Sequence, residues 1–173
     1  MTAILAIQHK NRVCLAGDTR ITNDSEYTDG ITKVFKVNQK VLAGVCGDAN
    51  LIDPFRRLLP NLRSSTGALD AARTLQNVLS SMNLPKDLEF SFLFVSKGES
   101  AELGETGLLS FPLVDGGTAR AGSGGLVADV YWHSQGGSLG SIRDAQDRLQ
   151  EAVATASKWR TDCGPTVRMV VST

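Results

Sequence analysis

The second residue of the chain, Thr2, carries a side chain that could act as a nucleophile. If Met1 is removed, Thr2 becomes the N-terminus and holds a hydroxyl group and a free amine on one residue. A threonine hydroxyl needs a positioned base. An α-amine, with an ordinary pKa of roughly 7.7–8.0, can accept the hydroxyl proton and return it to a leaving amine. This pairing is a way to hydrolyse an amide without a histidine base.

Two charged residues, Lys33 and Asp18, could tune such a nucleophile. A lysine charge near Thr2 would favour ionised oxygen and keep the α-amine neutral, if the strand of Lys33 lies beside the first strand. Asp18, at the end of the first predicted hairpin, could hold that lysine in place. Each residue also has an ordinary interpretation, Asp18 as a turn residue and Lys33 as a solvated strand lysine.

Two glycine-containing segments could supply hydrogen-bond donors for an oxyanion. Gly47 follows an apolar strand, and its backbone N–H could face a substrate carbonyl because glycine permits close approach. The run 122–125, Gly-Ser-Gly-Gly, precedes a predicted helix, so its free N–H groups and the Ser123 hydroxyl could face the same centre. The ordinary interpretation of Ser123 is a helix N-cap.

Apolar runs in the first third of the chain predict two hairpins. Residues 2–8 and 12–17 are almost continuously apolar, so we expect paired strands that are covered on both faces. Residues 32–37 and 40–46 predict a second pair. The stretch 19–30 is polar and aperiodic, which predicts a loop with at most a short strand.

Helices and strands then alternate in blocks. Spacings of three and four predict a helix around Leu51–Leu59, with Pro54 in its early turn. A second helix is expected over 69–82, closed by Asn83 and Pro85. The pattern after these two helices predicts extended segments from Phe90 to Ala121, helices over 126–134 and 142–156, and a final strand over 166–172. The predicted fold class is α+β: a four-layer α-β-β-α sandwich of two largely antiparallel sheets, forming one domain over 1–173.

Composition excludes several classes of function. Eighteen basic and eighteen acidic residues cancel, so bulk charge suggests neither nucleic-acid nor membrane binding. No apolar run approaches the roughly 20 residues that span a bilayer, and the N-terminus has no signal-peptide pattern, so we expect a soluble cytoplasmic protein. The cysteines and histidines have no metal-ligand or disulfide spacing, and no metal or cofactor is expected; these residues are Cys14, Cys46, Cys163, His9 and His133.

Five stretches of the chain, in this order, resemble the proteasome β-subunit family of N-terminal nucleophile hydrolases. The most similar member type is the bacterial proteasome-like protease that partners a ring-shaped ATPase unfoldase. The stretches that carry the resemblance are residues 2–7, 13–18, 33–34, 40–47 and 121–125. The resemblance covers essentially the whole chain, and the motifs are specific only in combination.

This resemblance implies a role for each matching residue. Thr2 would be the nucleophile and, through its freed amine, the base, while Lys33 tunes the site and Asp18 is its acidic partner. Gly47 would supply the amide that faces the oxyanion, and Ser123 would be the serine near the amine. Ile21 and Val45 would line the pocket for the side chain that precedes the cleaved bond. Both pocket residues are apolar, so apolar or small side chains are the expected preference.

The chain also departs from the family pattern. It is one residue shorter between Asp18 and Lys33 than the unfoldase-partnered enzyme. Arg160 and Cys163 fall where archaeal and eukaryotic relatives carry an Asp and a Ser. These differences weaken the resemblance to the archaeal arrangement of site residues more than the resemblance to the bacterial arrangement.

The resemblance further implies stacked homo-oligomeric rings that act on polypeptides, with amphipathic helices at subunit contacts. It leaves open six- or seven-fold symmetry and the presence of an ATPase unfoldase ring. Because a retained Met1 would block the amine, a catalytically silent, ring-forming scaffold subunit is the alternative hypothesis. A non-proteolytic amidase of related architecture is a more distant one.

Overall fold

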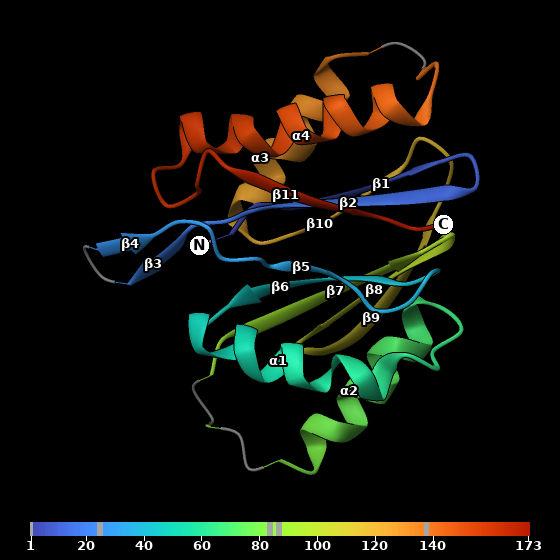
Figure 1. Ribbon diagram of the computed structural model, residues 1–173, viewed down its shortest axis with the longest axis vertical. Coiled ribbons are helices and arrows are strands. Elements are labelled where there is room, and N and C mark those ends of the chain that lie inside the picture. The colour runs from blue at the N-terminus through green and yellow to red at the C-terminus, as the bar shows by residue number, and fades with distance from the viewer. Residues whose placement is uncertain (1, 24–25, 83–84, 86–87, 137–138) are drawn as a thin grey trace.

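Two antiparallel sheets face each other at the centre of the molecule (Figure 1). The computed structural model describes residues 2–23, 26–82, 85, 88–136 and 139–173. Met1 and the predicted helix-closing Asn83 lie outside these described residues. The first sheet, in spatial order, contains β10 (Thr118–Ala121), β1 (Ile4–His9), β2 (Arg12–Asp18) and β11 (Val167–Val171). The second contains β5 (Val34–Lys36), β6 (Leu42–Gly47), β7 (Phe90–Ser96), β8 (Gly98–Gly104) and β9 (Gly107–Leu113).

Helices cover the outer face of each sheet (Figure 1). Helices α1 (Ile52–Leu58) and α2 (Ala68–Ser80) lie on the five-stranded sheet, with the short 3₁₀ helices η1 (Ala49–Leu51) and η2 (Leu59–Leu62) on either side of α1. Helices α3 (Ser123–Ser134) and α4 (Ile142–Trp159) lie on the four-stranded sheet. The predicted α-β-β-α order and the antiparallel pairing are therefore confirmed.

Three apolar cores fill the three spaces between these layers, and strand β1 contributes to two of them. Leu5 and Ile7 point into the core under α3 and α4, whereas Ile4 and Ala6 point into the core between the sheets. Alternate side chains of a strand lie on opposite faces, so a strand covered on both faces must be apolar throughout. This explains why residues 3–7 and 13–17 of the first hairpin include no charged or amide side chain.

The two sheets approach each other closely beside the N-terminal end of β1. A Cβ atom at Gly44 would lie 2.9 Å from Cδ1 of Ile4, and one at Gly17 would lie 2.9 Å from Cγ1 of Val34. Because glycine has no Cβ, the second sheet can contact the first at this end. The close approach brings the residues before β5 within reach of Thr2.

Three sequence-based predictions of local structure were wrong. The stretch 19–30 is not a loop with at most one strand, because β3 (Ile21–Asn23) and β4 (Glu26–Thr28) form a separate small hairpin. Strands of three residues are too short to produce a recognisable alternation. Helix α3 begins at Ser123 rather than near Leu126, and α2 ends at Ser80, before Met82.

Among the described helices, none combines the length and the apolar character needed to cross a lipid bilayer.

Candidate active site

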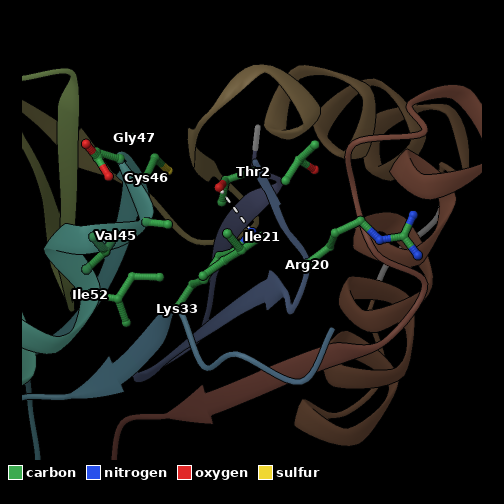
Figure 2. Close-up of a pocket in the computed structure, with 11 residues that line it drawn as sticks. Thr2, Arg20, Ile21, Lys33, Val45, Cys46, Gly47 and Ile52 are labelled. Atoms are coloured by element: carbon green, nitrogen blue, oxygen red, sulfur yellow. Dashed lines mark hydrogen bonds between the residues drawn. The ribbon is translucent and has the colours of Figure 1, made fainter. Parts of the chain in front are cut away.

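Thr2 lies in the extended segment just before β1 and is almost completely buried, with 5% of its surface exposed. Its Oγ1 accepts a hydrogen bond from Nζ of Lys33 at 3.1 Å, drawn as a dashed line in Figure 2. The main chain around Thr2 is held on both sides. The N–H of Gly124 donates to the Thr2 carbonyl at 3.1 Å, and the N–H of Ala3 donates to Oδ1 of Asp18 at 2.8 Å.

Lys33 reaches Thr2 from the opposite sheet. Lys33 directly precedes β5, and among the described strands β5 pairs with β6 rather than with β1. The Lys33 carbonyl accepts from the N–H of Val45 at 2.9 Å, which fixes its backbone to β6. Its ammonium group is 2% exposed and also contacts both carboxylate oxygens of Asp18 at 3.1 Å. Lys33 is therefore a buried ion-pair partner and not a solvated strand lysine.

Asp18 connects several segments of the chain and is fully buried. Besides the Lys33 ammonium, its carboxylate accepts the N–H groups of Ala3 at 2.8 Å, Arg20 at 3.0 Å and Gly164 at 3.1 Å. A buried charge is tolerated when it is paired and hydrogen-bonded in this way. Asp18 thus connects the N-terminal segment, the entrance to β3 and the loop after α4. The ordinary interpretation of Asp18 as a turn residue is excluded.

A pocket opens directly beside Thr2 and Lys33 (Figure 2). It encloses about 320 Å³, its open mouth included. Both predicted pocket residues, Ile21 and Val45, line it. Its lining also includes residues that the sequence analysis did not single out, among them Arg20, Thr22, Cys46, Ala49 and Ile52.

Gly47 lines the pocket on the side formed by Val45 and Cys46. The N–H of Val45 points toward Lys33, and that of Asp48 points the other way, to the carbonyl of Glu89 at 3.0 Å. Gly47, between these two residues, has a φ of +106° and so departs from regular strand geometry at the pocket.

The glycine run 122–125 packs directly on the nucleophile segment. A Cβ atom at Gly122 would lie 2.2 Å from the carbonyl oxygen of Thr2, so only glycine fits there. The Gly124 N–H is already used by that carbonyl and cannot also serve an oxyanion, which corrects part of the prediction for this run. Ser123 is the exposed first residue of α3, and its neighbours on both sides contact the Thr2 segment. The helix N-cap is Gly122, not Ser123.

The loop after α4 contributes a backbone N–H group to the surroundings of Asp18. Arg160 contacts Asp162 at 3.4 Å. Cys163 is fully buried, and this burial raises the pKa of its thiol to about 11. The Gly164 N–H is the group that reaches Asp18. Its contribution was missed because a main-chain donor leaves no signature in residue type.

Within the described part of the chain, no group of histidine, cysteine or acidic side chains is arranged to hold a metal ion. The described cysteines are unpaired thiols.

The first third of the chain is similar in sequence to proteasome subunits. The family model described as "Proteasome subunit" matches residues 2–59, the segment that contains Thr2, Asp18, Lys33 and Gly47. Over nearly its full length the chain is similar in fold to solved structures, among them eukaryotic HslV from Trypanosoma brucei. The TM-score is 0.71 at 21% sequence identity, covering 99% of this chain and 98% of that one. No curated protein matches in sequence. The resemblance to proteasome subunits is thus confirmed, and the likeness to HslV is one of fold.

Proposed function

We propose that the chain is a threonine-type endopeptidase subunit that uses Thr2 Oγ1 as its nucleophile. The observation that carries this proposal is the buried hydrogen bond from Lys33 to Thr2 Oγ1, beside a pocket that can receive a side chain. A structural threonine would not need a buried ammonium group with its own carboxylate partner. Burying such a pair carries a desolvation cost, so its position beside Thr2 favours a functional role.

The Thr2 α-amine, freed by removal of Met1, is the proposed general base. Lys33 already donates to Thr2 Oγ1 and to Asp18, so its nitrogen has no lone pair to offer. The α-amine takes the hydroxyl proton, directly or through one water, while Oγ1 bonds to the scissile carbonyl carbon. Ser123, next to two residues that contact the Thr2 segment, is the proposed partner of that amine.

The tetrahedral intermediate would carry its negative charge near the N–H of Gly47. Its collapse breaks the C–N bond, and the proton held by the amine goes to the leaving nitrogen. The product is an ester of Thr2, which water then hydrolyses with the same amine as base. The Lys33 charge at 3.1 Å lowers the energy of the ionised oxygen in both halves of the reaction.

Ile21 and Val45 line the pocket for the side chain that precedes the cleaved bond, and Ile52 adds a third apolar surface. We therefore expect small or apolar residues at that position. Peptides that vary only there provide the test, and a clear preference for acidic residues would contradict it.

Residues 1–173 are proposed to form one such domain within a stacked homo-oligomeric ring. Large apolar side chains stay exposed on α3 and α4, among them Leu126, Val130 and Trp159, the last at 75%. Contiguous exposed apolar surface is typical of interaction sites. Sedimentation velocity of the wild type and of Trp159→Ser should give a large assembly and a smaller one. Adding an ATPase unfoldase ring would then test the further partner that the family resemblance implies.

The experiment for the function itself is peptide hydrolysis by protein whose N-terminus is verified as Thr2. We expect activity that rises with pH through about 7–8, as the amine loses its proton, and none for Thr2→Ala. If Met1 is retained in the protein made in its native host and Thr2→Ala changes no measured property, the scaffold hypothesis replaces the peptidase.

A further inference from the structure

One wall of the pocket is a small hairpin that belongs to neither large sheet. Strands β3 and β4 have three residues each and pair only with one another among the described strands. In Figure 1 they project from the end of the molecule near the N-terminus. Ile21 and Thr22 of β3 nevertheless line the pocket beside Thr2. An isolated two-stranded hairpin is marginal in water, so this wall needs an external support.

The side chain of Arg20 supplies that support through three kinds of contact. Its Nε and Nη2 donate to the two carboxylate oxygens of Asp29, at 3.0 and 3.1 Å. Its guanidinium lies 4.0 Å from the ring centre of Tyr27 in β4. Its Nη1 donates to the carbonyl of Thr161 at 2.9 Å, in the loop after α4. Arg20 precedes β3 and Asp29 follows β4, so the bidentate pair closes the base of the hairpin.

The electrostatics of the pair agree with this geometry. The hydrogen bond to Asp29 raises the pKa of Arg20, and the same bond lowers the pKa of the Asp29 carboxyl. Both groups are accordingly charged at neutral pH. The planar fork of arginine matches a carboxylate in a way that lysine does not.

Arg20 is also connected to the nucleophile network, but through its backbone. Its N–H donates to Oδ2 of Asp18, the oxygen that also accepts from Gly164. In Figure 2 the guanidinium points away from Thr2. The side chain therefore acts on the wall of the pocket and not on the reacting atoms.

Gly164 makes room for this clamp. A Cβ atom there would lie 2.8 Å from Cβ of Arg20 and 2.9 Å from Oδ1 of Asp29. The loop that supports Asp18 is thus shaped to accept the Arg20–Asp29 pair.

We propose that Arg20 is a positioning residue that sets substrate affinity by holding the β3–β4 hairpin against the loop after α4. This inference rests on the proposed peptidase function for its kinetic consequence. The clamp holds Ile21 in the pocket wall, and the Lys33–Thr2–Asp18 contacts do not depend on the guanidinium. Loosening the clamp should therefore weaken binding of a peptide and leave the intrinsic reactivity of Thr2 unchanged.

The test compares three clamp variants, Arg20→Lys, Asp29→Asn and the two combined, with a control variant, Arg56→Lys. The last is a matched control, because Arg56 also contacts an aspartate, Asp53 at 3.4 Å, and an aromatic ring, that of Phe35, but lies on α1. We expect KM for a peptide to rise about fivefold in either clamp variant, with kcat near the wild-type value, as for loss of a well-oriented charged pair. The double variant should add little to the single ones, because they break the same contact. Arg56→Lys should leave KM unchanged.

Two further measurements separate this inference from the peptidase proposal. The rate at which a small electrophile labels Thr2 should be the same in all variants, and hydrogen exchange should accelerate in β3 and β4 but not in β1. If the wild type hydrolyses no peptide, the peptidase proposal fails, while hydrogen exchange still tests the clamp. Unchanged exchange in the hairpin of Arg20→Lys, or an equal loss of kcat and labelling rate, would overturn the inference.

Discussion

The two walls of the pocket beside Thr2 are built in different ways. One wall consists of β6, η1 and the start of α1, whose side chains Val45 and Ile52 belong to the apolar core under α1 and α2. The other wall is the β3–β4 hairpin, which is held to the loop after α4 by the Arg20 side chain and by a hydrogen bond from the Thr22 hydroxyl to the Asp162 carbonyl at 3.4 Å. The first is fixed by burial, whereas the second has Ile21 packed at the edge of the same core and is otherwise held by polar contacts at the surface.

The charged pairs beside the two walls illustrate the same difference. Lys33–Asp18 and Arg20–Asp29 have almost equal lengths, 3.1 and 3.0 Å. The first pair is 2% and 0% exposed, the second 15% and 38%. A charge left unpaired in the interior is far more costly than one left at the surface. The first pair is therefore part of the buried structure beside Thr2, whereas the second can change with little effect on the rest of the fold.

The largest expected effect comes from breaking the buried pair. Asp18→Asn should lower the free energy of unfolding by about 3–5 kcal/mol, because it leaves the Lys33 charge buried without its partner. Asp29→Asn should leave the free energy of unfolding almost unchanged. Denaturant titration of the two variants measures both quantities. Similar losses in the two would contradict the contrast between the pairs.

A somewhat smaller effect is expected at Gly47 in the core-packed wall. Gly47 has φ +106°, and a Cβ atom there would lie 2.2 Å from the carbonyl oxygen of Glu89. Gly47→Ala should cost about 3 kcal/mol and abolish hydrolysis, since the backbone of β6 must shift.

Gly30 provides the matched control, just beyond the hairpin. It has φ +92° but no atom within 4 Å of an added Cβ, so Gly30→Ala meets only the backbone penalty, about 1 kcal/mol. Thermal and denaturant unfolding would reveal whether the two costs differ as expected. Equal costs would mean that contact with Glu89 is unimportant.

Much of this architecture was predictable from the sequence, for physical reasons. The continuous apolar runs of β1 and β2 required strands covered on both faces, and the helical spacing around Leu75 and Leu149 required helices to cover them. The residue types of Thr2, Asp18 and Lys33 and the resemblance that they carry suggested a single site, and these three side chains do meet.

Other parts of the site have no recognisable pattern in the sequence. Lys33 reaches Thr2 from the opposite sheet, and the close approach depends on missing Cβ atoms at Gly44 and Gly17. The supporting bonds from Gly164 and Ala3 come from main-chain N–H groups, which any residue possesses. The role of Arg20 depends on a contact with Asp29 across a hairpin too short to be recognised from periodicity.

The selectivity of the pocket offers a more moderate test of the two walls. Val45→Ala enlarges the pocket on the side of the core-packed wall, which has little freedom to move inward. Peptides with a larger apolar side chain before the cleaved bond should therefore gain about tenfold in relative kcat/KM. Ile21→Ala changes the adjustable wall, and the hairpin can close part of the gap, so a gain of about threefold is expected. Competition between two peptides in one assay measures both ratios. The reverse order of effects would assign the rigid wall to the hairpin.

The smallest effect concerns thiol reactivity along the walls. Burial raises the pKa of Cys46 to about 12, so at pH 8 its thiolate is scarce and alkylation in the native protein should be very slow. A cysteine placed on the hairpin by Thr22→Cys should react quickly at the same pH, because that position is exposed. Mass spectrometry after a short exposure to iodoacetamide would distinguish them. Rapid labelling of Cys46 would show that the β6 wall opens readily.

The most direct measurement of the proposed chemistry is the intact mass of protein with a verified Thr2 N-terminus after exposure to a peptide vinyl sulfone. We expect one adduct, located on Thr2, absent in Thr2→Ala and formed much more slowly in Lys33→Met. A folded protein with a free Thr2 that forms no adduct would contradict a nucleophilic role for Thr2, and an adduct that forms equally fast in Lys33→Met would contradict activation by Lys33.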